Sequence, residues 1–146
     1  MSIHRGVWNW IGRCEGIARR FFGFGAAGSG GVVLLPEDRG DGQDYIDGTK
    51  RRVYGVELAR LLPLTLEAED EGNIAMLEAM DAIGQWIAER AAAGDYPDLG
   101  AGRTVTGIDV FDPQAVTALA MDGAWARYAL CFAVHYLQAP GARVGE

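Results

Sequence analysis

The chain has 146 residues, a formal net charge of −7 and 49% hydrophobic residues, which predicts one domain with enough apolar material for a core. The negative charge disfavours nucleic-acid binding as the main role, because an acidic surface gains nothing from neutralising phosphates. No apolar run approaches the length that spans a bilayer, and residues 1–10 lack the apolar core of a signal peptide, so neither a membrane span nor secretion by that route is expected.

The first predicted element is a helix from Val7 to Phe22, in which apolar residues recur at helical spacing. Gly23 is expected to end it, because glycine adopts the left-handed conformation at low cost. The following loop, 23–31, contains a G-x-G-x-x-G match. Dinucleotide binding is not favoured there, because that chemistry needs a strand before the loop and a helix after it, and here the order is reversed.

Two strands are predicted next, a short one at Val32–Leu35 and a long one over about Lys50–Leu64. Between them, Glu37–Asp44 is expected to be a polar loop rich in acids. Asp47-Gly48 is typical of a two-residue hairpin turn, because both central residues of a type I′ turn have positive φ. The sequence therefore predicts an exposed acidic hairpin, which fits either a solvated loop or an interaction surface.

A helix is predicted from Asp70 to about Ala93, with one apolar stripe at spacings of three and four. Three strands follow at Val105–Phe111, Val116–Met121 and Trp125–Leu137, the last two joined by a tight turn at Asp122-Gly123. One face of the last strand is large and apolar and is expected to pack against the helices: Ala126, Tyr128, Leu130, Phe132, Val134 and Tyr136.

This order of elements predicts an α+β fold, with a mostly antiparallel sheet of about five strands and two helices packed on one face. We expect a single domain over 1–146, made of an N-terminal helix (7–22), a core (32–137) and a mobile tail (139–146).

No pattern of chemically active residues stands out. His135 and Cys131 are four residues apart on one strand face, roughly 13 Å, which is too far for a catalytic Cys–His pair. Cys14 and Cys131 are expected to be buried free thiols rather than a disulfide. The acids at 67–71 fit a helix start, where they complement the dipole. We therefore expect no catalytic residue, no metal and no cofactor, and no enzymatic activity.

The N-terminal segment is rich in aromatic residues. Trp8 and Trp10 are two residues apart and cannot share one helix face. Together with Phe21, Phe22 and Phe24 they make this segment richer in aromatic residues than one packed helix needs. Such a segment indicates a partner site, and the alternative is that these side chains simply cover the sheet.

Several landmarks carry a resemblance in their order and spacing over about Val32–Leu137. They are Tyr45-Ile46-Asp47-Gly48 with the strand Val53–Leu58; Glu69-Asp70-Glu71-Gly72-Asn73 leading into Ile74–Ile87; Tyr96-Pro97-Asp98-Leu99; and Ala126-Arg127-Tyr128 with Val134-His135-Tyr136. In this arrangement the chain resembles the small tail-terminator (tail-completion or minor capsid) proteins of long-tailed bacteriophages.

The resemblance implies a subunit of a ring, commonly a hexamer, that caps the head-proximal end of the tail tube, stops its polymerisation and joins the tail to the head. The implied partners are copies of itself, the tail tube protein and head–tail connector or neck proteins, with DNA only as passing cargo and no membrane. The implied location is the virion, at the head–tail junction, after assembly in the host cytoplasm. No reaction and no cofactor are implied.

Within that framework we predict two sets of interface residues. Acids of the hairpin region would line the lumen or a subunit interface, and repeated around a ring they would repel the phosphates of passing DNA: Glu37, Asp38, Asp41, Asp44 and Asp47. Apolar residues of the N-terminal segment, the edge strand Val32–Leu35 and the hairpin would contact a neighbouring subunit or partner: Trp8, Trp10, Phe24, Val32, Leu34 and Tyr45.

Three alternatives remain. One is another head–tail neck adaptor, head-closure or baseplate component, which the sequence does not separate from a terminator. Another is a small α+β enzyme or ligand-binding domain, which would need a pocket with convergent polar groups. The third is a cellular interaction module unrelated to phage.

Overall fold

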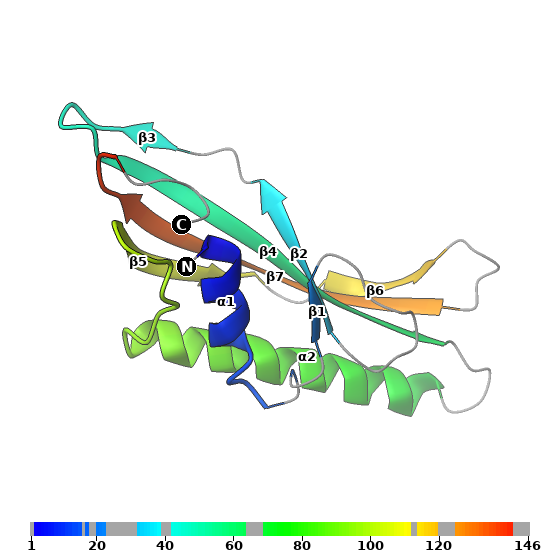
Figure 1. The fold of residues 1–146 in the computed structure, drawn as a ribbon. Coiled ribbons are helices and arrows are strands. Elements are labelled where there is room, and N and C mark those ends of the chain that lie inside the picture. The colour runs from blue at the N-terminus through cyan, green and yellow to red at the C-terminus, as the bar shows by residue number, and fades with distance from the viewer. Residues whose placement is uncertain are drawn as a thin grey trace.

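The structure is a computed structural model, and it describes residues 2–15, 17, 20–22, 32–38, 42–63, 69–111, 114–119 and 125–141. These residues form one sheet in the order β1-β2-β4-β7-β5, with β3 paired to β4 and β6 paired to β7 (Figure 1). The elements in chain order are α1 (Ile3–Ile11), β1 (Arg20–Phe22), β2 (Val32–Asp38), β3 (Gln43–Asp44), β4 (Lys50–Pro63), α2 (Glu69–Ala92), β5 (Arg103–Val110), β6 (Gln114–Leu119) and β7 (Trp125–Gln138).

The centre of the sheet is a long antiparallel ribbon of β4 and β7. The two strands pair from Lys50↔Gln138 to Pro63↔Trp125, which spans about 45 Å at the rise of an extended strand. β3 pairs with one end of this ribbon and β6 with the other. Only β1 and β2 pair in parallel among the described strands. The predicted α+β class with a mostly antiparallel sheet is therefore confirmed.

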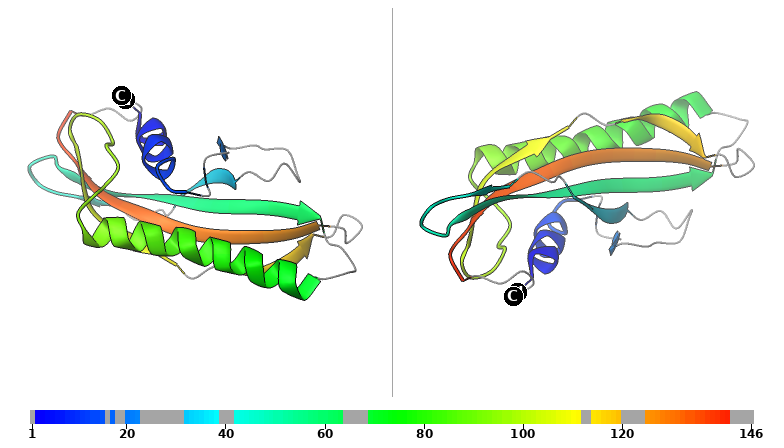
Figure 2. Two further views of the ribbon diagram at one scale, coloured as in Figure 1. Left: turned by 90° about the horizontal axis from the view of Figure 1, so that it is seen from below. Right: turned by 90° about the horizontal axis from the view of Figure 1, so that it is seen from above.

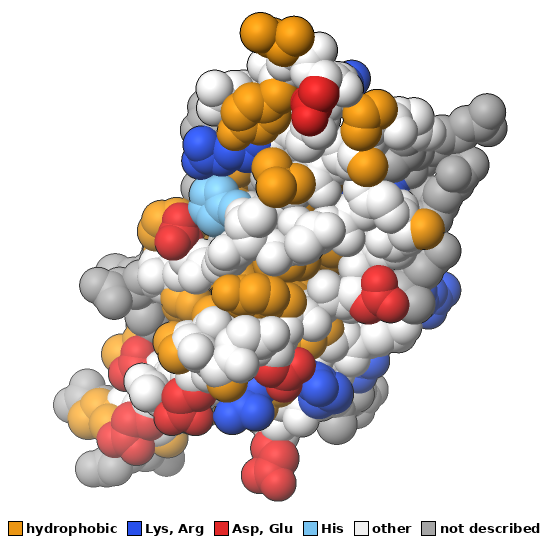
Figure 3. Space-filling model, turned by 90° about the vertical axis from the view of Figure 1, so that its left-hand side faces the viewer, with side chains coloured by type: hydrophobic (Ala, Val, Ile, Leu, Met, Phe, Trp, Pro, Cys, Tyr) orange, Lys and Arg blue, Asp and Glu red, His pale blue; other side chains and the backbone are white. Residues whose placement is uncertain are grey.

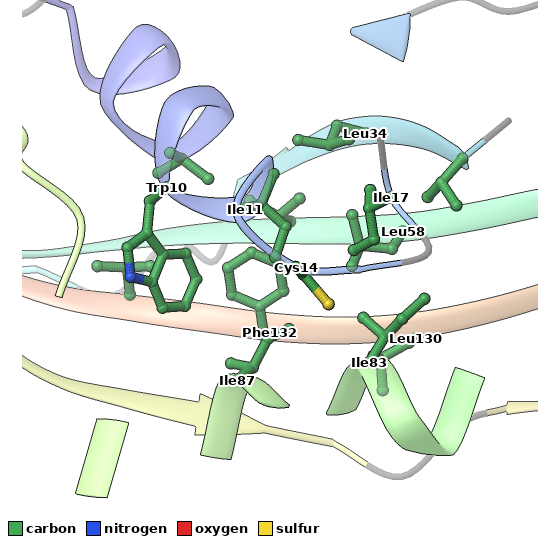
Figure 4. Close-up of a cluster of buried hydrophobic side chains, with 14 of the residues drawn as sticks. Trp10, Ile11, Cys14, Ile17, Leu34, Leu58, Ile83, Ile87, Leu130 and Phe132 are labelled. Carbon is green, nitrogen blue, oxygen red and sulfur yellow. The ribbon is translucent and has the colours of Figure 1, made fainter. Parts of the chain in front are cut away.

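Both helices pack on the same face of the sheet, as predicted. Alternate residues of the ribbon, such as Leu58, Leu130 and Phe132, are fully buried on that face. Figure 4 shows Trp10 of α1 and Ile87 of α2 contributing to the same cluster as these strand residues. α2 runs alongside the ribbon in both views of Figure 2. Its bounds agree with the predicted helix to within one residue at each end.

The predicted N-terminal helix over 7–22 is wrong in its second half. α1 begins after Ser2, whose hydroxyl accepts a hydrogen bond from the Arg5 N–H (3.1 Å), and ends before Gly12. Arg20–Phe22 instead forms β1 and pairs with β2. Cys14 and Ile17 are still buried in the core, which is why the apolar spacing looked helical. Pairing with an open strand edge satisfies the backbone and overrides the helical pattern, which glycines already weaken.

The short predicted strand at Val32–Leu35 is longer than expected and is not an edge at its start. β2 continues to Asp38, because Glu37 and Asp38 pair with Gly55 and Tyr54 of β4. Its first residues lie between β1 and β4. The prediction that Glu37 and Asp38 belong to a loop is therefore wrong, and so is the prediction of a free edge at Val32–Leu34.

The predictions for the cysteines, the C-terminal tail and the loops have different outcomes. Cys14 and Cys131 are buried free thiols, as predicted. At the first residue of the predicted mobile tail, the Ala139 N–H donates to the Gly102 carbonyl (2.7 Å), and the mobility of the tail stays a prediction. The loop 23–31 and the turn Asp122-Gly123 lie outside the described residues.

Among the helices of the described chain, none has the length and apolarity that a membrane crossing requires.

Candidate functional site

The hairpin between β3 and β4 is present, but its turn differs from the predicted one. The Tyr45 N–H donates to the Thr49 carbonyl (2.8 Å), and the Gly48 N–H donates to the Tyr45 carbonyl (3.0 Å). Gly48 has a φ of +89°. These bonds enclose a three-residue loop, Ile46–Gly48, whose last residue is left-handed, rather than a two-residue type I′ turn. The Thr49 N–H also donates to the Asp47 carboxylate (2.9 Å), and this bond lowers the pKa of Asp47.

The tip of this hairpin is apolar as well as acidic. Ile46 is completely exposed (108%) and Tyr45 is 42% exposed. Asp44 accepts a hydrogen bond from Arg52 (3.2 Å) while its side chain stays 70% exposed. Figure 3 looks at this end of the molecule, where hydrophobic and acidic side chains lie next to each other on the surface. We call residues Asp44–Asp47 the hairpin tip.

Three of the predicted contact residues belong to the core instead. Trp10, Val32 and Leu34 are exposed by 4%, 0% and 0%. The Trp10 indole N–H donates to the Asp95 carbonyl (3.0 Å), and its ring lies against Trp86 with a centroid distance of 5.1 Å. These side chains pack within their own subunit, so the prediction that they form an intermolecular contact is wrong.

Trp8 faces the other way and lines a surface hollow of about 310 Å³, together with Ser2, His4, Arg5 and Phe22. We call this the aromatic hollow. Its rings contact one another edge to face, with centroid distances of 6.3 Å for Trp8–Phe22 and 5.4 Å for His4–Phe22. The guanidinium of Arg20 lies 4.3 Å from the centroid of the Trp8 ring, a cation–π geometry.

Tyr54 joins the aromatic hollow to the sheet. His4 Nδ1 and the Tyr54 hydroxyl oxygen lie 2.6 Å apart, which is hydrogen-bond distance between α1 and β4. Burial raises the pKa of Tyr54 far above its ordinary value, with a smaller contribution from Tyr136. The Tyr54 hydroxyl therefore keeps its proton at any physiological pH.

Replacing Tyr54 with phenylalanine is expected to lower the free energy of unfolding by about 1 kcal/mol, because a hydrogen bond to a half-buried group is lost without a change of shape. Urea denaturation followed by tryptophan fluorescence measures this difference. Tyr45→Phe is the matched control, since Tyr45 lies on the exposed tip, and it should leave the unfolding midpoint unchanged. Equal effects of the two variants would contradict the assigned role of Tyr54.

A cluster on the outer face of the sheet was not foreseen from the sequence. Glu37, Glu57 and Cys131 bring one potential ligand atom each to within 4.8 Å of one another. Their strands are neighbours, and the register places Glu57 directly opposite Cys131. Glu57 forms an ion pair with Arg127, so a guanidinium already supplies the positive charge beside this carboxylate. No local pattern reveals this cluster, because its members come from three strands.

The remaining predicted residues are placed as follows. His135 pairs with Asp109, at 2.7 Å between Nε2 and Oδ2, which agrees with the expected structural role of this histidine. Phe24 and Asp41 lie outside the described residues. For Asp38 the structure describes the backbone alone.

No protein-family model matches the chain. No curated protein matches it either.

Proposed function

We propose that this protein is a structural virion subunit that caps the head-proximal end of a bacteriophage tail tube, stops its polymerisation and joins the tail to the head. The landmarks described in the sequence support it, and so does the confirmed α+β architecture that the resemblance implies. In this role the protein catalyses no reaction and needs no cofactor. Its partners are further copies of itself in a ring, for which a hexamer is the expected size, the tube protein and the neck proteins.

The observation that carries the proposal is the exposed apolar residue at the hairpin tip. Ile46 stands fully in solvent at the end of the long β4–β7 ribbon. Turns normally carry polar or small residues, so the adjacent exposed apolar side chains of Tyr45 and Ile46 on a well-bonded turn favour a protein–protein contact. A hairpin that projects from a small sheet is consistent with a subunit that functions in assembly.

The acids at the tip support the same role through their charge. Asp44 and Asp47 remain exposed. Repeated around a ring, these carboxylates would create a negative field that repels DNA phosphates and lets DNA pass without binding. The net charge of −7 acts in the same direction.

The aromatic hollow bears on the alternative of an enzyme or ligand-binding domain. Its volume of about 310 Å³ is at the lower end for small-molecule sites. Among the described residues that line it, two side chains are basic, His4 and Arg5, and none carries a carboxylate. That lining suits an acidic protein segment better than a catalytic acid–base pair.

Deleting the gene from the phage genome that encodes the chain is expected to produce overlong tails that fail to attach to filled heads, because nothing would stop tube growth. Tail lengths measured by negative-stain electron microscopy test this, with a plasmid-borne copy as the control that restores normal length. Tails of normal length that fail to join heads would indicate a neck adaptor instead. Fully normal particles would contradict the structural role.

A further inference from the structure

The aromatic hollow is a basic patch on an acidic protein. α1 contains His4 and Arg5 and no acidic residue, whereas the whole chain has 20 acidic residues against 13 lysines and arginines. Arg20 adds a further positive charge against the Trp8 ring. The hollow therefore attracts acidic groups while its floor of aromatic rings favours an apolar side chain.

The hairpin tip has the complementary chemistry. Its charged residues, Asp44 and Asp47, are both acidic and flank the exposed pair Tyr45-Ile46. The tip is also held in one conformation by the backbone bonds of Tyr45 and Gly48 and by the Asp47 carboxylate. A preorganised loop loses little conformational entropy on binding. An isoleucine between two carboxylates thus matches a hollow of aromatic rings beside Arg5.

The tip cannot reach the hollow of its own subunit. The hollow adjoins Tyr54, while the tip begins beyond Lys50, about 13 Å further along the same strand. β4 is paired with β7 along this whole stretch and cannot fold back. The two complementary surfaces therefore meet only between different molecules.

We infer that the hairpin tip of one copy of this chain binds in the aromatic hollow of a second copy. Ile46 packs in the hollow against the Trp8 and Phe22 rings, and the acids of the tip face Arg5 and His4. Because the two surfaces differ, the contact is heterologous and repeats head to tail, which generates a ring when the rotation closes. This inference specifies the contact between neighbouring subunits of the ring in the proposed function. It rests on the proposed function only for the closing of the repeated contact into a ring.

Disulfide trapping tests the contact directly. Purified Ile46→Cys protein mixed with purified Arg5→Cys protein, each at about 100 µM, is expected to give a covalent dimer on a non-reducing gel. The double variant Ile46→Cys/Arg5→Cys is expected to give a ladder of multimers, because each copy then carries both partners of the contact. The native Cys14 and Cys131 are buried and should not contribute. Ala82→Cys, exposed on α2, replaces Arg5→Cys as the matched control and should give no dimer with Ile46→Cys.

Ile46→Asp is expected to weaken self-association at least tenfold, measured by light scattering over a concentration series, since it removes the apolar anchor of the contact. Its unfolding midpoint should not change, because Ile46 touches no core residue. Ile74→Asp is the control, since Ile74 is an exposed isoleucine (50%) on α2. It should leave association unchanged.

Absence of the mixed dimer, or equal effects of the two aspartate variants, would overturn the inference. The outcome is separable from that of the proposed function. A ladder of cross-linked multimers together with normal tails after gene deletion would support the contact and contradict the tail-terminator function. Overlong tails without cross-linked multimers would support the tail-terminator function and contradict this contact.

Discussion

Phe132→Ala is expected to lower the free energy of unfolding by about 3–5 kcal/mol, the largest loss from any single substitution considered for this protein. The Phe132 side chain is fully buried at the centre of the cluster in Figure 4, where its ring centroid lies 6.2 Å from that of Trp10. Removing the ring leaves a cavity between the sheet and both helices. A domain of this size has about 5–15 kcal/mol of stability in total, so a substantial part of it would be lost.

Chemical denaturation of the two proteins, with tryptophan fluorescence as the signal, gives the difference in unfolding free energy. Phe111→Ala is the matched control, because Phe111 is 45% exposed just after β5. It should change stability by no more than about 0.5 kcal/mol. If both variants lost the same amount, the assignment of the Phe132 face of β7 to the core would be wrong.

Gly6→Ala and Gly84→Ala are expected to change stability in opposite directions, although both glycines lie inside helices. Alanine favours a helix over glycine by about 0.8–1.0 kcal/mol in each case. At Gly84 the added methyl group would lie 3.6 Å from the methyl groups of Leu130, an ordinary contact, so this variant should be stabilised by up to that amount. At Gly6 the methyl group would collide with the backbone carbonyl of Asp98.

The backbone at Asp98 cannot move aside easily. The Asp98 carboxylate accepts a hydrogen bond from the Gly100 N–H (2.9 Å), Leu99 is 1% exposed, and the Leu99 carbonyl accepts one from Arg103 (3.2 Å). α1 would therefore have to shift, and we expect a net loss of about 1–3 kcal/mol for Gly6→Ala. Thermal unfolding of both variants measures the signs. Stabilisation by both would show that α1 does not approach this loop closely.

The longest elements were predictable from the chain alone. β4, β7 and α2 each agree with their expected bounds to within one residue. Their length gives the apolar period many repeats, and for β7 the alternation also identified the face that packs against the helices. The α+β class follows, because such elements have few other ways to cover their apolar sides.

Short segments were decided by their neighbours. Arg20–Phe22 continues an apolar spacing that fits a helix, yet it forms β1 because β2 offers an unpaired edge. Trp8 and Trp10 illustrate the same limit within one helix. The helical period shows that they face different ways, but only the packing of α1 on Phe132 and Trp86 decides that Trp10 is the buried one.

The hairpin tip and the aromatic hollow also differ in how far the sequence alone determined them. The hairpin tip is continuous in the chain, so its exposed, acidic and apolar character was determined by Asp44–Asp47 themselves. The aromatic hollow is built from α1 and β1, and its hydrogen bond to Tyr54 comes from a third element. Local preferences of the backbone act over a few residues, so the identity of those residues determines them. Which distant side chains come together depends on strand pairing and helix packing, and only the tertiary structure decides that.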